Sequence, residues 1–243
     1  MKKILLIDIS NSFTKICTAI SGSLSRVKRL PTPSLNAAQL CALYSSHTFD
    51  GVVLASVVPE KNREVRGAFP GVLEVGPSLD LGVGIDYPSP RTIGADRLAN
   101  AAACAALHGF PGIVVDFGTA VTFDVISYAG NYMGGVIAPG LNAMTGYLHD
   151  RTALLPNIKL REPTSAVGRS TRDAMLSGAI HGYRGLVKEI LAQIRSEAFP
   201  KKRPLIIATG GDAELIAGRV GLFDIVDPLL TLRGLLVIAQ RNL

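Results

Sequence analysis

The sequence predicts an α/β fold built from two related halves with a nucleotide cleft between them. An apolar, β-rich run that ends in aspartate and a short turn occurs twice, at residues 4–12 and 113–122. The two aspartates, Asp8 and Asp116, lie 108 positions apart, close to half of the 243-residue chain. Strand patterns also alternate with helical patterns in both halves, which is typical of α/β layers. A tight turn after a strand exposes backbone N–H groups beside a carboxylate, a combination suited to nucleotide phosphates and their cation.

The first half is predicted to mix strands and helices. Strands are expected near residues 3–9, 13–20, 26–30, 52–57 and 72–75, and helices near 36–46 and 60–68. Residues 76–92 contain too many Gly and Pro for a regular element, and loops of this kind carry binding groups on rigid scaffolds. Residues 95–107 are rich in Ala and predict a helix that packs closely against a neighbour.

The second half begins again with a strand, an Asp turn and a strand. Strands are expected near residues 112–117, 120–127, 131–138, 205–208 and 223–226, and helices after residue 140 and at 171–198, 213–218 and 229–241. The turn residues at 109–112 separate the two patterns. The domain boundary is therefore expected near 107–112, with an N-terminal domain at 1–109 and a C-terminal domain at 110–243.

Composition indicates a well-packed globular protein, since 48% of the residues are hydrophobic and only 18% are charged. The longest apolar stretches run to about 10 residues, against the roughly 20 needed to cross a bilayer, so no membrane association is expected. Asp8 interrupts the apolar run near the start, and no small-residue cleavage site follows it. A cytoplasmic location is expected.

Cysteine usage argues against a disulfide-bonded or metal-binding protein, and the distribution of charge argues against a nucleic-acid-binding protein. Cys17, Cys41 and Cys104 are odd in number, widely spaced and set among apolar neighbours, which predicts core thiols rather than disulfides or a metal site. The net charge of +6 and the pI near 9.4 raise the question of nucleic-acid binding. The basic residues are dispersed, however, and the one cluster, at 201–203, is predicted to be a solvated loop. Nucleic acid is not an expected partner.

Several common motifs are absent from the sequence. There is no P-loop, no complete Rossmann glycine pattern and no G-x-S-x-G, and the four histidines lack metal-ligand spacing. Apart from the two Asp turns, the chain offers Gly210-Gly211-Asp212, where a strand leads into a helix. Backbone can approach a ligand closely at such a glycine pair, or the segment is an ordinary turn with an Asp helix cap.

Five short segments occur in a characteristic order along nearly the whole chain. They are Asp8-Ile9-Ser10-Asn11-Ser12, Tyr87 with Gly94-Ala95-Asp96-Arg97, Val115-Asp116-Phe117-Gly118-Thr119-Ala120, Gly134-Gly135-Val136-Ile137-Ala138-Pro139-Gly140 and Gly168-Arg169-Ser170-Thr171. In this order they resemble the type III pantothenate kinases, of the actin, sugar kinase and heat-shock ATPase superfamily. The resemblance implies two actin-like (ribonuclease H-like) α/β domains.

The resemblance also implies an activity, its cofactors and its partners. The implied reaction is ATP-dependent phosphorylation of pantothenate to 4'-phosphopantothenate, the first step of coenzyme A biosynthesis. ATP, Mg²⁺ and a monovalent cation, K⁺ or NH₄⁺, would be required. The family is typically a homodimer with its substrate site near the subunit interface, so a homodimer is expected.

Site residues follow from the same resemblance. The residues implied at ATP are Asp8, Ile9, Ser10, Asn11, Ser12, Phe13, Thr14, Lys15 and Thr119. Those implied at pantothenate are Tyr87, Gly94, Ala95, Asp96, Arg97 and Thr171. Asp116 would hold the monovalent cation, and Asp96 would be the catalytic base.

The residue chemistry agrees with these roles in kind but leaves alternatives open. Asp96 lies at the start of a predicted helix and next to Arg97, and both the helix N-terminus and the arginine favour the ionised carboxylate. The same position would suit an aspartate that only stabilises the helix dipole. Arg97 could pair with the pantothenate carboxylate or form a surface ion pair. Thr171 could bind substrate or cap the long helix. Asp116 could hold a cation or accept turn N–H groups.

The first turn departs from the family pattern. Ser10 stands where the family has Gly, and Phe13 where it has a second Asn. A Cβ at position 10 costs energy if the turn requires a positive φ. Two other functions stay open: a non-catalytic transcription regulator on the same fold, which these departures and the basic pI suggest, and a kinase for another small polar alcohol.

Overall fold

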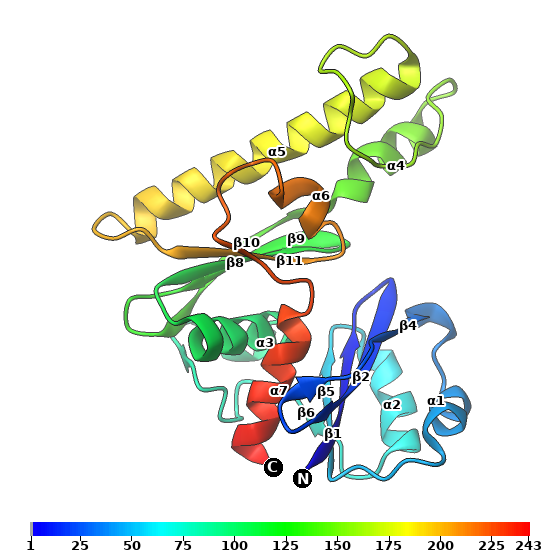
Figure 1. Ribbon diagram of the computed structural model, residues 1–243, viewed down its shortest axis with the longest axis vertical. Coiled ribbons are helices and arrows are strands. Elements are labelled where there is room, and N and C mark those ends of the chain that lie inside the picture. The colour runs from blue at the N-terminus through cyan, green and yellow to red at the C-terminus, as the bar shows by residue number, and fades with distance from the viewer. Residues whose placement is uncertain (1) are drawn as a thin grey trace. The chain divides into compact units, whose positions relative to one another are not determined.

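The computed structural model describes residues 2–243 and contains two compact units, each built on a mixed sheet (Figure 1). One unit comprises the chain up to Gly109 together with Gly130–Met133 and Leu229–Leu243. The other comprises Phe110–Ala129 and Gly134–Pro228. The division into functional domains at 1–109 and 110–243 stays a prediction. By its contacts, the C-terminal segment Leu229–Leu243 belongs to the first unit.

The sheet of the first unit is centred on the strand that carries the first aspartate. Its strands are β1 (Lys3–Ile9), β2 (Phe13–Ile20), β3 (Ser23–Leu24), β4 (Lys28–Pro31), β5 (Gly51–Ser56) and β6 (Leu73–Glu74). The order is β3-β2-β1-β5-β6, with β4 paired to β2. β1 and β2 form an antiparallel hairpin, whereas β1, β5 and β6 run parallel. β1 is buried from its second residue onward, as its continuous apolar run requires of a central strand.

Helices cover this sheet. α1 (Ala37–Tyr44) and α2 (Pro59–Ala68) contribute Leu40, Tyr44 and Val65 to a core that also holds Leu5, Ile7 and Leu54 of the sheet. α7 (Leu230–Asn242) packs on β1, β5 and the Ala-rich α3 (Ala95–Ala103), which continues into the π-turn η3 (Cys104–His108). Gly234 of α7 lies directly against the Ala99 carbonyl. The predicted close packing of the Ala-rich helix is confirmed.

The sheet of the second unit is centred on the strand that carries the second aspartate. Its strands are β8 (Gly112–Phe117), β9 (Ala120–Ile126), β10 (Asn131–Pro139), β11 (Leu205–Gly210) and β12 (Ile225–Val226), in the order β12-β11-β8-β9-β10. The short β7 (Gly84–Ile85) pairs with Asn131 and Tyr132 at the start of β10. The helices are α4 (Leu141–Arg151), α5 (Thr171–Ala198) and α6 (Ala213–Ala217).

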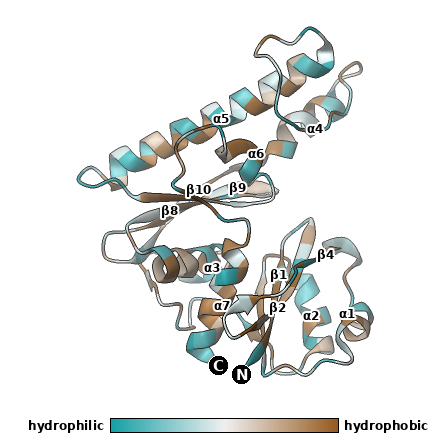
Figure 2. Ribbon diagram, in the orientation of Figure 1, coloured by the Kyte–Doolittle hydropathy of each residue, from teal (hydrophilic) through white to brown (hydrophobic). Residues whose placement is uncertain are grey.

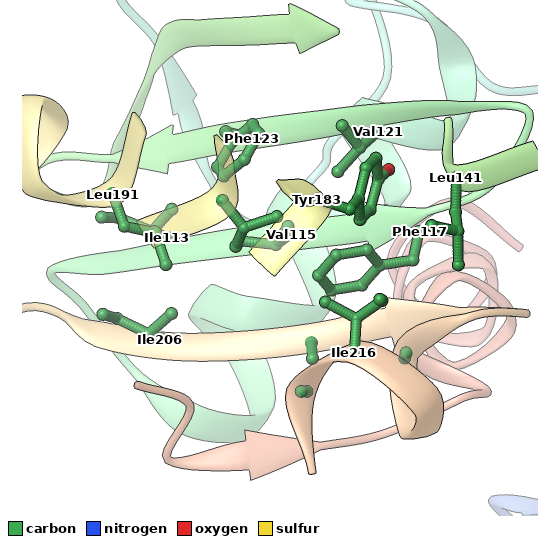
Figure 3. Close-up of a cluster of buried hydrophobic side chains, with 14 of the residues drawn as sticks. Ile113, Val115, Phe117, Val121, Phe123, Leu141, Tyr183, Leu191, Ile206 and Ile216 are labelled. Carbon is green, nitrogen blue, oxygen red and sulfur yellow. The ribbon is translucent and has the colours of Figure 1, made fainter. Parts of the chain in front are cut away.

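The 28-residue helix α5 provides most of the cover for this second sheet. In Figure 2 its ribbon alternates between hydrophobic and hydrophilic colours along its length, as expected of an amphipathic helix. Tyr183 and Leu191 of α5 meet Ile113, Val115 and Phe117 of β8 in the buried cluster shown in Figure 3. The apolar spacing that predicted this helix at 171–198 therefore reflects the face that it buries.

The internal repeat seen in the sequence is also present in the sheet topology. In the first sheet the order β2-β1-β5-β6 combines one antiparallel pair with two parallel pairs. The order β9-β8-β11-β12 in the second sheet has the same pattern of antiparallel and parallel pairs. Each aspartate strand thus has an antiparallel hairpin partner on one side and a parallel strand on the other.

Most predicted elements occur within a few residues of their expected bounds, and two details differ. The strand expected at 205–208 extends to Gly210, because its ladder with β8 continues through Thr209 and Gly210. Residues 76–92 contain only β7 and the 3₁₀ turn η2 (Pro90–Thr92) as regular elements. Within residues 2–243, no helix combines the length and the apolar character that a membrane span requires.

The prediction that all three cysteines are core thiols is wrong for one of them. Cys17 and Cys104 are 2% and 0% exposed, but Cys41 is exposed on α1. The apolar neighbours of Cys41 in the sequence are misleading because α1 buries only Leu40 and Tyr44.

Thiol labelling should therefore separate the three cysteines. Burial raises the pKa of the Cys17 thiol to about 11, so at pH 8 it is protonated as well as covered. We expect a thiol-specific disulfide reagent to modify one thiol quickly in the native protein and all three after denaturation. Cys41→Ser should remove the fast phase and leave the slow one. A fast phase of two or three thiols would contradict this assignment.

Candidate active site

The first Asp turn lies at the end of β1. Asp8 is 2% exposed, and its Oδ2 lies 3.6 Å from Nζ of Lys15, its partner in the hairpin register. The turn closes with a hydrogen bond from Ser10 N–H to the Phe13 carbonyl (3.2 Å). Asn11, Ser12 and Phe13 are exposed, whereas Ile9 and Thr14 are buried. Ile9 and Thr14 can therefore face a ligand only through their backbone.

Ser10 does not strain this turn. Ser21 is the one residue other than glycine with a positive φ in the described part of the chain, so Ser10 has an ordinary backbone conformation. The energetic cost that the sequence predicted for a Cβ at position 10 depends on a positive φ and is therefore absent. Phe13, the other departure from the family pattern, is 39% exposed and lies under the Arg29 guanidinium, 4.0 Å from ring centre to Cζ.

A residue that the sequence did not single out holds the turn in place. Thr32, in the 3₁₀ turn η1 (Thr32–Ser34), is 2% exposed. Its hydroxyl donates to the Ser10 carbonyl (2.7 Å), and its N–H donates to the Ser12 carbonyl (3.1 Å). The Thr14 and Thr32 hydroxyl oxygens are 3.0 Å apart. No local pattern marks Thr32 for this role, because its contacts lie about 20 residues away.

The Gly94–Arg97 segment forms the N-terminus of α3. Gly94 occupies the N-cap position, and the Asp96 Oδ1 accepts a hydrogen bond from Arg97 N–H at 2.8 Å. A Cβ at position 94 would lie 2.6 Å from Asp96 Oδ1, closer than real contacts allow. Only glycine leaves the carboxylate where it is. Ala95 is 8% exposed, so its side chain belongs to the core rather than to a ligand surface.

Val57 links this segment to the first Asp turn. Its N–H donates to the Ile9 carbonyl (3.0 Å) at the end of β1. Its Cγ1 would lie 3.5 Å from a Cβ at Gly94, which is ordinary contact distance. The structure thus brings the predicted phosphate turn and the predicted catalytic aspartate to the same end of one sheet, although about 85 residues separate them in sequence.

Two tyrosines and an arginine meet beside Asp96. The Arg97 guanidinium carbon lies 5.6 Å from the centre of the Tyr132 ring, and Tyr87 meets the same ring edge-on at 6.1 Å. Tyr132 is fully buried, whereas Tyr87 and Arg97 are half-buried. The sequence predicted Tyr87 and Arg97 but not Tyr132, which reaches them because β7 pairs with the start of β10.

The second Asp turn, in the other unit, is enclosed by two glycines. A Cβ at Gly140 would lie 2.3 Å from the Gly118 carbonyl oxygen and 2.4 Å from that of Thr119. A Cβ at Gly210, whose φ is +95°, would lie 2.5 Å from Asp116 Oδ1 and from the Phe117 carbonyl oxygen. Both backbones therefore lie against the turn with no space for a side chain. Thr119, at its tip, is exposed.

Polar side chains continue across the sheet from Asp116. In the strand register Asp116 lies between Thr209 of β11 and Thr122 of β9, so the three share one face of the sheet. Thr209 is 1% exposed, and its hydroxyl has no hydrogen-bond partner among residues 2–243. This row provides one carboxylate and hydroxyl oxygens, the ligand type that hard cations prefer. The described residues contain no group of three or more His, Cys, Asp or Glu that could hold a metal ion.

Thr171 does not cap α5, so that alternative is wrong. The N-cap is Ser170, whose hydroxyl accepts from Asp173 N–H (3.1 Å) and donates to the Asp173 carboxylate (2.7 Å). Thr171 occupies the first helical position and is exposed. Asp212 is the N-cap of α6, as one alternative expected, but its side chain makes no capping hydrogen bond.

Comparison with known proteins shows the family of the chain. The family model described as type III pantothenate kinase matches residues 4–193. The chain belongs to the type III pantothenate kinase family. The family member from Akkermansia muciniphila is 50% identical over 98% of this chain and 99% of its own. The one from Methylacidiphilum infernorum is 41% identical over 97% of this chain and 88% of its own.

The fold of the chain is similar to those of several solved structures. A protein described as a Baf-family transcriptional activator, from Campylobacter jejuni, is 23% identical with a TM-score of 0.65, covering 97% of each chain. Component A of the Acidaminococcus fermentans (R)-2-hydroxyglutaryl-CoA dehydratase is 12% identical with a TM-score of 0.56, covering 98% and 96% of the two chains. At these identities the likeness concerns the fold alone. The predicted class of two related actin-like α/β domains is confirmed, and the cleft between them stays a prediction.

The enclosure of the second turn gives a stability prediction. Gly210→Ala should lower the free energy of unfolding by about 3 kcal/mol, because the new Cβ meets both the Asp116 carboxylate and backbone, at a positive φ. Gly211→Ala is the matched control, since nothing lies within 4 Å of a Cβ there. Urea unfolding of the two variants measures the difference. Equal stability of the two variants would show that the turn relaxes without cost.

Proposed function

We propose that this chain is an ATP-dependent pantothenate kinase in which Asp96 is the catalytic base. The observation that carries the proposal is the position of Asp96 at the same sheet end as the first Asp turn, joined to it through Val57. Relatives with the type III pantothenate kinase name at 41% and 50% identity support the activity. The reaction forms 4'-phosphopantothenate, the first step of coenzyme A biosynthesis.

Asp96 would accept the proton of the pantothenate hydroxyl. The Arg97 N–H holds one carboxylate oxygen at 2.8 Å, and Gly94 leaves that oxygen the space it occupies. Orientation matters more than basicity here, because phosphoryl transfer passes through a loose transition state in which the hydroxyl proton leaves late. A carboxylate held in one orientation at a helix N-terminus meets this need.

The pantothenate carboxylate would pair with Arg97. A guanidinium binds a carboxylate through two parallel hydrogen bonds, and the Tyr132 ring under Arg97 restricts where the guanidinium can lie. Tyr87, against the same ring, would contact the apolar part of the substrate. We include Thr171, exposed at the start of α5, in the pantothenate site.

The first turn would hold the ATP phosphates. Its exposed tip at 11–13 offers backbone N–H groups, and Lys15 places a cation beside Asp8. Thr119 would contact ATP from the second turn. Mg²⁺ would be bound together with the nucleotide phosphates, where it neutralises charge that develops during transfer.

Asp116 would hold the monovalent cation. The residues around it fit K⁺ or NH₄⁺, since the turn offers one carboxylate and several oxygens, and the described chain has no cluster of ligands suited to a transition metal. Such a cation would supply positive charge at the second Asp turn.

We further propose a homodimer in the cytoplasm, where ATP is available. Large apolar side chains are exposed in and around α4: Tyr147 is 67% exposed, Leu154 90% and Val167 78%. Exposed apolar side chains of this size are typical of protein interfaces. Sedimentation of the pure protein measures the oligomeric state.

The base assignment predicts a separation of rate from binding. Asp96→Asn should lower kcat by about 10² to 10⁴ while the KM for pantothenate stays near the wild-type value, because the amide keeps the shape but cannot accept the proton. Glu197→Gln, an exposed carboxylate-to-amide change near the end of α5, is the control. Wild-type turnover in Asp96→Asn would remove Asp96 from the mechanism.

The role of Thr32 predicts an effect on the nucleotide. Thr32→Val loses the hydrogen bond to the Ser10 carbonyl, which should raise the KM for ATP by about fivefold. Thr32→Ser keeps the hydroxyl and should restore the KM for ATP. The KM for pantothenate should respond to neither change. Identical KM values for ATP in Thr32→Val and wild type would show that the turn is held by other contacts.

The cation assignment is tested by a coupled kinase assay with and without K⁺. We expect K⁺ to stimulate turnover, and Asp116→Asn to raise the K⁺ concentration for half-maximal activity by about tenfold, since the ionic attraction is lost. The same assay decides between functions. No turnover with any nucleotide donor, together with salt-sensitive DNA binding, would favour the transcription regulator. A panel of small alcohols would identify another acceptor.

A further inference from the structure

A basic pocket in the first unit lies apart from the residues assigned so far. It has a volume of about 320 Å³ and is lined by, among others, Lys3, Thr18, Ser25, Arg26, Lys28 and Tyr44. We propose that this pocket binds a phosphate-bearing small molecule at a site distinct from the one for ATP. The proposal goes beyond the kinase reaction and does not depend on it.

The pocket lies on the sheet face that α1 packs against. In the strand register Lys3 pairs with Ile20 and Leu5 with Thr18, so Lys3 and Thr18 share the sheet face that carries Leu5. α1 ends at Tyr44, which packs with Leu5 and lines the pocket. Lys3 begins β1 and Asp8 is five residues further along, which is roughly 17 Å at the rise of a strand. The pocket is therefore at the far end of β1 from the first Asp turn.

The cations of the pocket are not neutralised by partners. Lys3, Arg26 and Lys28 form no ion pair with any residue in 2–243, and the pocket lining contains no Asp or Glu. One carboxylate lies beside the lining: that of Asp50, which accepts a hydrogen bond from Lys3 N–H. Even with that charge and the partial negative charge of the α1 C-terminus, three cations leave the pocket positive.

Two of these cations are positioned by aromatic rings. Lys28 Nζ lies 5.0 Å from the Tyr44 ring centre, and Lys3 Nζ lies 5.2 Å from that of Phe49. Tyr44 and Phe49 also meet edge-on at 5.9 Å, so both rings belong to one cluster. An ammonium held over a ring has fewer conformations to lose when an anion binds.

These features favour a compact, multiply charged anion. Two ammonium groups, one guanidinium and the Thr18 hydroxyl supply the donors that phosphate oxygens accept. The volume is that of a small-molecule pocket. A nucleic acid would instead require a basic stripe along its backbone, and three cations around one hollow do not form one.

Binding can be tested with pyrophosphate as the probe, by following backbone amide resonances of the ¹⁵N-labelled full chain. We expect saturable shifts at Thr18, Ser25 and Arg26, separate from any shifts at residues 10–13 caused by binding at the ATP site. Arg26→Gln/Lys28→Gln should weaken the affinity at the pocket amides by about tenfold or more. Lys201→Gln/Lys202→Gln removes the same charge from an exposed loop and should leave that affinity unchanged.

The outcomes separate the possibilities. All four substitutions change exposed side chains, and kinase turnover without added pyrophosphate should be unchanged in both double variants. Absence of saturable shifts at the pocket amides in the wild-type protein would overturn the proposal without bearing on the kinase reaction. Shifts at these amides with a single-stranded oligonucleotide but not with pyrophosphate would also overturn it, in favour of nucleic acid. Equal weakening in both double variants would show that general charge, not the pocket, attracts the anion.

Discussion

The close approach of two glycine backbones to the Asp116 turn is the constraint on which the second unit depends. Gly140 follows β10 and Gly210 ends β11, so both neighbouring chain segments are fixed against the turn that ends β8. Any side chain at either glycine would displace the turn oxygens or the carboxylate. The segments that lead into α4 and α6 are therefore coupled to the position of one turn.

The two Asp turns share a topology but are held differently. Each follows a central strand with an antiparallel partner on one side and a parallel partner on the other. In the second turn glycine backbones leave no space, whereas in the first turn the hydroxyl and N–H of Thr32 make directed hydrogen bonds. Ser10, which stands where the family has glycine, has an ordinary φ within this arrangement. The two turns therefore differ in the contacts that hold them, and the first turn carries no backbone strain at Ser10.

Sequence patterns predicted the helices and strands whose formation depends on residues close together in the chain. The helix at 171–198 follows from apolar spacing over many turns, and the aspartate strands follow from continuous apolar runs. The exposure of Cys41, the capping of α5 by Ser170 rather than Thr171, and the contacts of Thr32 and Tyr132 were not predicted from the sequence. The exposure of Cys41 depends on which face α1 buries, and the contacts of Thr32 and Tyr132 depend on residues far away in the chain. The cap of α5 is local, but it depends on which of two adjacent hydroxyl residues precedes the first helical turn. The motif residues were found through family likeness, since neither Gly94 nor Asp96 stands out by pattern alone.

The hydrogen bonds of Thr32 mean that the first turn is organised before any ligand arrives. A flexible phosphate loop loses conformational entropy when it closes on a nucleotide, and that loss weakens affinity. Here the ordering of the turn is part of folding, since a buried threonine in η1 already holds the Ser10 and Ser12 carbonyls. In the role proposed for this turn, nucleotide affinity would be limited by the fit of the phosphates, and exchange of ADP for ATP would require no rebuilding of the loop.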